Sequence, residues 1–305
     1  MSLGAHVRMA MGAPLAALLS YLPAALILLA PAHAEETGHH PEGPPFQLRL
    51  DDMGSAMRIA QADPATPVGS APGSAAENTQ LALRMARERL SNGSPDWTDR
   101  GVEIAHQFGA RKSLVGSFTD SSRFGLVDST AMLEGYYPLG ERLTGNLAAS
   151  ASGTHHVLPR STLYGQLAYA LEAGWGVLGG IKQSVYNTTT VNVADLTLER
   201  YFRDYRAAFT VLPAHSQTAG NATSYRMVFG YYYGDENRVQ ALFARGTEVD
   251  RPTGVDVVLA TQVRSTALFG RHWIGRAFAF DYGMSRTVQG SVTRNGLNAG
   301  LRYRF

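Results

Sequence analysis

The sequence predicts an all-β protein: a transmembrane up-and-down antiparallel β-barrel of about 14 strands (range 12–14), preceded by a disordered segment. Three observations predict this class. The final strand ends on an aromatic residue, hydrophobicity alternates with a period of two from Leu81 onward, and short connections alternate with longer ones. All three are typical of bacterial outer-membrane barrels, whose strands turn alternate side chains to lipid and to the lumen.

The last fourteen residues, Val292 to Phe305, carry the strongest of these signals. One face of this segment is apolar and carries Phe305, Tyr303, Leu301, Ala299 and Leu297. The other face carries Arg304, Arg302, Gly300 and Asn298. Because successive side chains of a strand point to opposite faces, we expect the first set to face lipid and the second to face the lumen.

Residues 1–34 have the organisation of a secretory signal peptide. An apolar run from Met11 to Ala30 follows a polar start, and Ala32-His33-Ala34 places small residues at a cleavage site, so we expect cleavage after Ala34. The alternative is a transmembrane anchor, because the run approaches membrane-spanning length. The prolines within the run and the Ala-x-Ala site favour a signal peptide.

Residues 35–79 are rich in proline, alanine and glycine. Such a segment cannot bury enough apolar area to offset the entropy of ordering it. We interpret it as a disordered periplasmic lead, with a short helical turn near Leu50–Gln61 as an alternative. The predicted barrel then occupies residues 80–305.

From Leu81 onward, segments of about ten residues alternate in hydrophobicity between turn residues. In one segment Leu163, Leu167, Tyr169 and Leu171 alternate with Tyr164, Gln166, Ala168 and Ala170. In another Tyr225, Met227, Phe229, Tyr231 and Tyr233 alternate with Ser224, Arg226, Val228 and Gly230. The first strand, Leu81–Leu90, is ambiguous because its residues could also begin a helix.

The spacing of turn residues predicts the connections. Short turns are expected near residues 109–111, 139–141, 172–174, 203–204, 234–237 and 270–274. Longer loops are expected at 91–99, 153–159, 213–221, 247–254 and 286–291. Short periplasmic turns and longer outside loops are typical of bacterial barrels, and an even number of strands places both termini in the periplasm.

Composition excludes several functions. The net charge of +2 does not favour binding to nucleic acid, and the absence of cysteine excludes disulfides and thiol chemistry. We expect no cofactor and no metal site, because paired histidines in flexible loops make a poor preformed site. The sequence from Gly174 to Gly179 matches a dinucleotide-binding pattern, but no helical period follows it, so we read it as a glycine-rich strand.

Several short motifs occur in a characteristic order: Asp96-Trp97, Arg123-Phe124-Gly125, Tyr136-Tyr137-Pro138-Leu139, Leu158-Pro159-Arg160 and Arg200-Tyr201-Phe202. In their order and spacing, residues 81–305 resemble the YaiO-like family of outer-membrane β-barrel proteins. The resemblance implies a location in the cell outer membrane and contact with its lipid. It also implies insertion by the barrel-assembly machinery, with Leu301, Tyr303 and Phe305 as the assembly signal. It implies no established chemistry.

The alternation also predicts which charged side chains line the lumen: Glu103, Glu134, Lys182, Arg206, Arg226, Arg264 and Arg302, with Gln107, Asp128, Arg238 and Arg304 as further candidates. We expect acidic residues on one arc and arginines on the opposite arc, setting a transverse field that would orient solutes. The alternative is that these charges pair and close the bore.

These features favour a non-enzymatic protein: a narrow pore or export-associated barrel for a polysaccharide or small polar solutes. One alternative is an outer-membrane lipid-modifying enzyme that uses a rim histidine such as His155, His156 or His215. A hydrolase also needs a nucleophile and an orienting group within hydrogen-bond reach, and no spacing here supplies them. A further alternative is a structural or surface-interaction barrel whose loops bind a partner.

Overall fold

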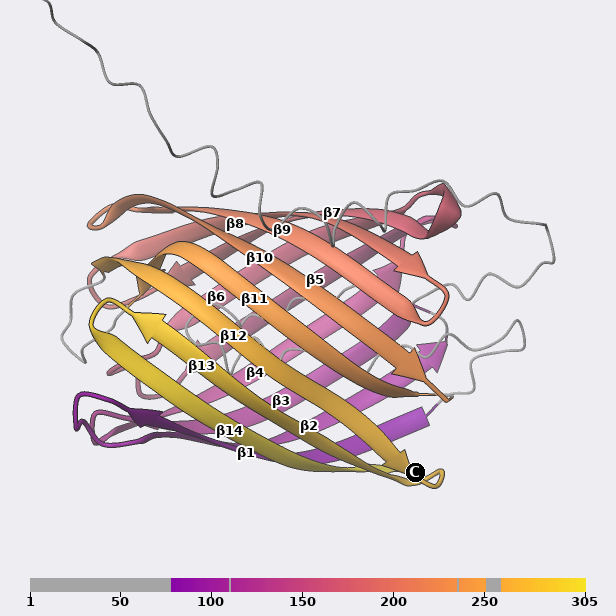
Figure 1. The fold of residues 1–305 in the computed structure, drawn as a ribbon, viewed down its shortest axis with the longest axis horizontal. Helices are drawn as coiled ribbons and strands as arrows, with labels where there is room; N and C mark the ends of the chain where they lie inside the picture. Colours follow the sequence, from indigo (N-terminus) through magenta and orange to yellow (C-terminus); the bar gives the residue numbers. More distant parts are fainter. Residues whose placement is uncertain (1–77, 110, 235, 251–258) are drawn as a thin grey trace, which may run out of the picture. The chain divides into compact units, whose positions relative to one another are not determined.

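The computed structural model describes residues 78–109, 111–234, 236–250 and 259–305. Within them, strands pair with their neighbours in sequence, and the last strand pairs with the first, so that the sheet closes as an antiparallel barrel (Figure 1). The strands are β1 (Asn78–Leu90), β2 (Trp97–Gly109), β3 (Lys112–Arg123), β4 (Leu126–Pro138), β5 (Leu143–Ser152), β6 (Ser161–Ala170), β7 (Trp175–Val185), β8 (Thr190–Phe202), β9 (Tyr205–Ser216), β10 (Gly220–Tyr233), β11 (Asn237–Asp250), β12 (Leu259–Ile274), β13 (Phe278–Gln289) and β14 (Val292–Arg304). A 3₁₀ turn, η3 (Glu172–Gly174), precedes β7. The predicted barrel is confirmed with 14 strands, and its ambiguous first segment is a strand.

The predicted signal peptide, its cleavage after Ala34 and residues 35–77 of the predicted lead lie outside the described residues. Asn78 and Thr79, which the sequence assigned to the lead, belong to β1 and pair with β2. Within the described ranges, no helix has both the length and the apolar character needed to cross a membrane.

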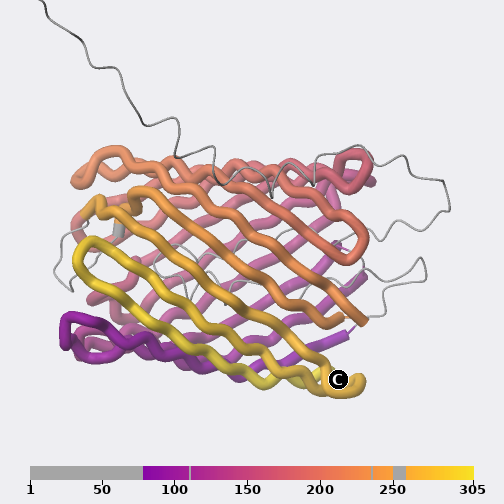
Figure 2. The backbone as a smooth tube through the Cα atoms, viewed as in Figure 1, coloured from indigo at the N-terminus to yellow at the C-terminus, as the bar shows by residue number. Residues whose placement is uncertain are grey.

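The barrel has two distinct ends. Because the strand number is even, β1 begins and β14 finishes at the same end, which we call the terminus rim (C in Figures 1 and 2). The opposite end, the loop rim, holds the connections 91–96, 124–125, 153–160, 186–189, 217–219 and 290–291. Connection 251–258 at this rim is outside the described residues.

The predicted contrast in connection length is wrong at several places. The β9–β10 connection is residues 217–219 and the β13–β14 connection is 290–291, because the polar residues predicted as loops continue the strands. The turn predicted at 270–274 is also wrong, since β12 runs to Ile274. Gly270 marks a close approach and not a turn: a Cβ there would lie 2.5 Å from the Tyr282 hydroxyl and 2.7 Å from the Arg238 carbonyl oxygen.

The outward face of the barrel is apolar. Leu147 is 63% exposed and Leu196 is 59% exposed, although both lie in the middle of strands. Many, though not all, of the aromatic residues of this face lie near the terminus rim: Tyr137, Tyr169, Trp175, Phe202, Tyr205, Tyr231, Tyr233, Phe278, Tyr303 and Phe305. An exposed apolar band bordered by aromatic rings is the surface that a barrel presents to lipid.

The inward face is polar and buried. Gln80 and Glu88 alternate with exposed residues in β1, and Thr210 lies inward in β9 beside outward Phe209. Small apolar clusters interrupt this wall, including Met132, Ala148 and Tyr164. The barrel is therefore inverted relative to a soluble protein, with polar groups inside and apolar groups outside.

Lipid exposure can be tested by placing one charge at two depths. Leu147→Arg, in the middle of β5, should lower the free energy of unfolding in lipid vesicles by about 2–4 kcal/mol, whereas Ile274→Arg, at the terminus rim, should lower it by about 0–1 kcal/mol. Urea titrations of vesicle-inserted protein, followed by tryptophan fluorescence, measure both values. Equal costs at the two positions would contradict the assigned lipid boundary.

Candidate functional site

The inward wall is the candidate site. The structure places six of the seven principal lumen candidates on it as buried side chains: Glu103, Glu134, Lys182, Arg206, Arg226 and Arg302. Gln107, Asp128 and Arg238 are also buried and inward-facing. That these residues line an open passage stays a prediction. The three proposed assembly residues, Leu301, Tyr303 and Phe305, face outward, and their recognition also stays a prediction.

The prediction for Arg264 is wrong. In β12 the inward positions are Val263, Ser265, Ala267 and Phe269, and Arg264 is exposed on the outward face. The sequence does not show which face of β12 is inward, because inward Val263 and Phe269 are as apolar as outward Leu268. At this strand hydrophobicity does not distinguish the two faces.

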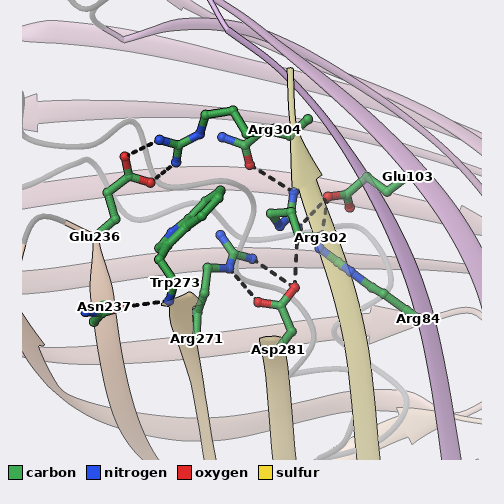
Figure 3. Close-up of polar contacts among 10 residues, drawn as sticks. Arg84, Glu103, Glu236, Asn237, Arg271, Trp273, Asp281, Arg302 and Arg304 are labelled. Atoms are coloured by element: carbon green, nitrogen blue, oxygen red, sulfur yellow. Dashed lines mark hydrogen bonds and ion pairs between the residues drawn. The ribbon is translucent and has the colours of Figure 1, made fainter. Parts of the chain in front are cut away.

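An ion network joins five strands at the seam where the barrel closes (Figure 3). Arg302 of β14 donates to Glu103 of β2 at 3.0 Å and lies 3.5 Å from Asp281 of β13. Arg84 of β1 donates to the same Glu103 oxygen at 2.9 Å, and Arg271 of β12 donates to Asp281 at 2.5 Å. The two carboxylates are thus shared among three guanidinium groups.

A second group of polar and aromatic contacts lies beside this network at the terminus rim (Figure 3). Arg304 forms an ion pair with Glu236 in the β10–β11 turn, and its guanidinium carbon lies 3.8 Å from the centre of the Trp273 ring. The Trp273 backbone N–H donates to the Asn237 side chain at 2.7 Å. Figure 3 shows these groups beside the ion network, so charged and aromatic side chains occupy this end of the interior.

The middle of the barrel holds carboxylates bound by neutral donors. The Tyr164 hydroxyl donates to Asp195 at 3.1 Å, and Gln166 donates to the other oxygen of Asp195 at 2.9 Å. Gly180 makes room for this group, because a Cβ there would lie 2.3 Å from an Asp195 oxygen. The segment that matches a dinucleotide-binding pattern, Gly174 to Gly179, contains the last residue of η3 and the start of β7, so the expected glycine-rich strand is confirmed from Trp175 onward.

Glu134 in β4 and Glu199 in β8 are further buried carboxylates, closer to the terminus rim than Asp195. The Tyr136 hydroxyl donates to Glu134 at 2.5 Å, and Asn146 donates to the same oxygen at 3.1 Å. Arg206 donates to Glu199 from the neighbouring strand at 3.0 Å. These pairs meet the requirement that a buried charge be hydrogen-bonded or paired.

At the loop rim, a carboxylate holds the β5–β6 connection against the inner wall. Asp128 is fully buried and accepts hydrogen bonds from the backbone N–H groups of His156, Val157 and Leu158 at 2.8–2.9 Å. The His156 ring nitrogen lies 3.0 Å from the same carboxylate. Val157 and Leu158 are buried, so this connection turns into the mouth and narrows it.

Two of the sequence motifs meet at the same rim. Trp97 is buried between the guanidinium groups of Arg123 and Arg294, each 4.6 Å from the centre of its ring. Phe124 packs edge-on against Trp97 at 5.2 Å. The Asp-Trp and Arg-Phe-Gly motifs thus form one cluster beside the mouth.

The predicted segregation of acidic and basic arcs is wrong. Asp195, Glu199 and Asp281 lie on the later strands, among the arginines. Ion pairs also form between neighbouring strands, as Arg206 with Glu199 and Arg294 with Glu88 show. Pairing is favoured because each unpaired buried charge carries a desolvation cost of several kcal/mol.

Sequence reasoning missed several members of the site. Arg271 was assigned to a turn, and Arg84, Asp195, Glu199 and Asp281 were not selected. Asp195 and Glu199 are four residues apart in β8 and both are buried, so they lie on the same face of the strand. Extending the alternation through that strand would have identified both as inward. No local signal joins Arg271 to Asp281.

The described rim histidines have polar partners. The His156 ring nitrogen lies 3.0 Å from Asp128, and the His215 ring nitrogen lies 2.8 Å from the Asn221 side chain. The described residues include no group of three His, Cys, Asp or Glu side chains placed to hold a metal ion.

The ion network predicts a large contrast between two arginine substitutions. Arg302→Met removes a buried partner of Glu103 and Asp281 and should lower the free energy of unfolding by about 3 kcal/mol. Arg87→Gln removes an exposed pair with Asp96 and should cost less than about 1 kcal/mol. Urea titration in lipid vesicles compares the variants. Similar losses for both would show that the buried network does not stabilise the barrel.

Comparison with known proteins identifies the fold. The CymD monoaromatic hydrocarbon channel is 9% identical, with a TM-score of 0.50 over 84% of this chain and 98% of that chain. Omp33 of Acinetobacter baumannii is 14% identical, with a TM-score of 0.47 over 75% of this chain and 99% of that chain. Curated proteins gave no match.

The family comparison agrees with the motifs found in the sequence. The family model described as the YaiO membrane beta barrel domain matches residues 78–251, which is more than half of the chain and spans β1 to β11. The inverted distribution of polar and apolar side chains fits this assignment. The chain belongs to the YaiO family of outer-membrane β-barrel proteins.

Proposed function

We propose that this barrel is a narrow, charge-lined pore that passes small polar solutes or a polysaccharide chain. The observation that carries the proposal is the inward wall itself. Charged or hydrogen-bonding side chains occupy it from Arg302 near the terminus rim, through Asp195, to Asp128 near the loop rim. Polar groups along the length of the wall are what a path for polar solutes requires.

The side chains of the wall support a narrow path. Large inward groups such as Tyr164, Leu178 and Leu242 are at most 3% exposed, and the β5–β6 connection narrows the loop rim. Fourteen strands lie between the filled eight-stranded barrels and the open sixteen-stranded porins. In such a narrow path, which solutes pass would depend on their contacts with the wall and not on free diffusion through a wide bore.

The inward residues also favour a substrate class. The inward wall carries neutral hydrogen-bonding side chains, among them Thr144, Thr162 and Thr197, whose chemistry suits sugar hydroxyls. Lys182 and Arg226 add positive charge in the middle of the wall. This combination favours polar or anionic solutes, including an acidic polysaccharide.

The alternative of a lipid-modifying enzyme receives less support. It needs a nucleophile beside a histidine at the lipid boundary. The ring of outward-facing His215 has an asparagine partner, Asn221, at 2.8 Å. The alternative of a structural or surface-interaction barrel predicts that the purified protein conducts no ions.

Conductance in planar bilayers tests the pore. Wild-type protein should give small unit currents, and the double variant Lys182→Gln, Arg226→Gln should shift permeability toward cations because two positive charges leave the wall. Arg100→Gln, on the outward face of β2, is the matched control and should leave the permeability ratio unchanged.

An anionic oligosaccharide added to the same bilayers distinguishes the substrate classes. It should block wild-type channels more strongly than a neutral one of equal length, and the double variant should lose this difference. Absence of any current from folded wild-type protein would refute the pore. Current that is insensitive to the double variant would refute the role of the charged wall.

The Asp128 contact predicts a measurable change at the mouth. The chain has no native cysteine, so Val157→Cys provides a single label site that is 5% exposed in the parent. Adding Asp128→Ala removes the acceptor of three backbone N–H groups and should raise the rate of maleimide labelling by at least about tenfold. Asp120→Ala, on the outward face of β3, is the control. Equal rates in all three proteins would show that Asp128 does not hold the connection.

A further inference from the structure

Three arginines lie side by side on the outward face near the loop rim. They are Arg245 of β11, Arg264 of β12 and Arg286 of β13, and all three are exposed. In the strand register Arg245 is directly opposite Arg264, and Arg264 is opposite Val288, two residues from Arg286. Their Cβ atoms are therefore about 5 Å apart for the direct pair and about 7–8 Å apart for the diagonal pair. We call this set the outward arginine cluster.

The cluster lies where the apolar band ends. Toward the terminus rim, the outward face continues with Phe243, Leu268 and Met284, which are 40–55% exposed. Toward the loop rim, it continues with Thr247 and Gln262. The cluster therefore lies at the boundary between the apolar and the polar parts of the outward face.

Strand geometry places this level at one membrane boundary. From Arg264 to Ile274, at the terminus rim, β12 advances about 25 Å along the barrel axis at about 3.4 Å per residue and a tilt of about 40°. This distance equals the height of the apolar band of outer-membrane barrels, about 25 Å. An arginine at such a boundary costs about 0–1 kcal/mol, whereas one at the midplane costs about 2–4 kcal/mol.

The charges of the cluster are not neutralised by the described part of the protein. None of its three arginines forms an ion pair with a described carboxylate. Two outward arginines on β1 and β2 have a carboxylate beside them: Arg87 pairs with Asp96 at 2.6 Å, and Arg100 lies opposite Asp120 in the strand register. Like charges directly opposite each other destabilise a strand pair, so the Arg245–Arg264 arrangement is favourable only when an anion lies between them.

We propose that the outward arginine cluster binds the phosphate groups of the phosphorylated glycolipid of the outer leaflet, lipopolysaccharide. Both chain termini of an outer-membrane barrel with an even number of strands lie in the periplasm, so the loop rim faces the outer leaflet. Guanidinium groups bind phosphate through two parallel hydrogen bonds, and neighbouring arginines can share one phosphate or hold two. The acyl chains would lie along Phe243, Leu268 and Met284.

The contrast between the two rims supports this assignment. Outward aromatic rings border the membrane at the terminus rim, where ordinary phospholipid headgroups are expected. On β11, β12 and β13 the opposite border carries arginines in their place. A surface of fixed positive charge matches a lipid whose sugar headgroup carries phosphates.

Native mass spectrometry of the full chain in neutral detergent, with bis-phosphorylated lipid A as the probe, tests the proposal. Wild-type protein should retain lipid A, and the variant Arg245→Gln, Arg264→Gln, Arg286→Gln should bind at least about tenfold more weakly, since several charge-assisted hydrogen bonds are lost. Arg100→Gln should bind as wild type does. Raising the salt concentration should weaken wild-type binding but not that of the triple variant.

Two further arms keep the result interpretable. Heat-modifiable migration on gels shows whether each variant is folded. If the triple glutamine variant does not fold, two variants replace it: Arg264→Gln alone, and the variant in which all three arginines are changed to lysine. The lysine variant should keep part of the affinity, because charge remains and the planar fork is lost. Dephosphorylated lipid A should not bind.

Some outcomes would overturn the proposal. Equal binding of lipid A by the wild type and the folded triple variant would exclude the cluster as the site. A further such outcome is that the wild type binds phosphatidylglycerol as tightly as lipid A and loses both with the same substitutions. That result would show a surface that binds anionic lipids in general and not a glycolipid site. Neither result depends on whether the barrel conducts ions.

Discussion

Closure of the sheet between β1 and β14 is the constraint on which the rest of the structure depends. In hydrocarbon every backbone N–H and C=O group needs a partner, and a sheet provides one only when it has no open edge. The eleven paired positions between these strands, from Gln80–Arg304 to Leu90–Arg294, remove that edge. The ion network of Arg302 with Glu103 and Asp281 lies on the inner side of this seam, where the first and last parts of the chain meet.

The sequence predicted the fold well because the determining signal is local. A period of two counted back from Phe305 places Leu301 outward and Arg302 inward, and both lie there. The same reasoning failed at Arg264, since Val263 and Phe269 are apolar but inward. It also failed at the ends of strands, because polar residues beyond the apolar band continue the alternation and resemble a loop.

The contacts inside the barrel could not be predicted in the same way. Which carboxylate meets which arginine depends on the register between strands, and residues as distant in sequence as Glu103 and Arg302 pair only after closure. The Asp128 contact with residues 156–158 depends on the path of a connection, which no periodicity encodes. The alternation along the strands predicted a polar interior, and the register between strands determined which of its groups pair.

Arginine occurs in this barrel in two environments that follow opposite rules. Inside, Arg302 is fully buried, so its charge is tolerated only because fixed carboxylates surround it. Outside, Arg264 is exposed beside Arg245, and no described carboxylate pairs with either. The internal charges are balanced by the chain and hold the wall in one arrangement, whereas the outward charges need a counter-ion from the membrane. The apolar band between them keeps these two sets of charges apart, so a barrel can couple a rigid polar interior to a lipid-dependent surface through the same strands.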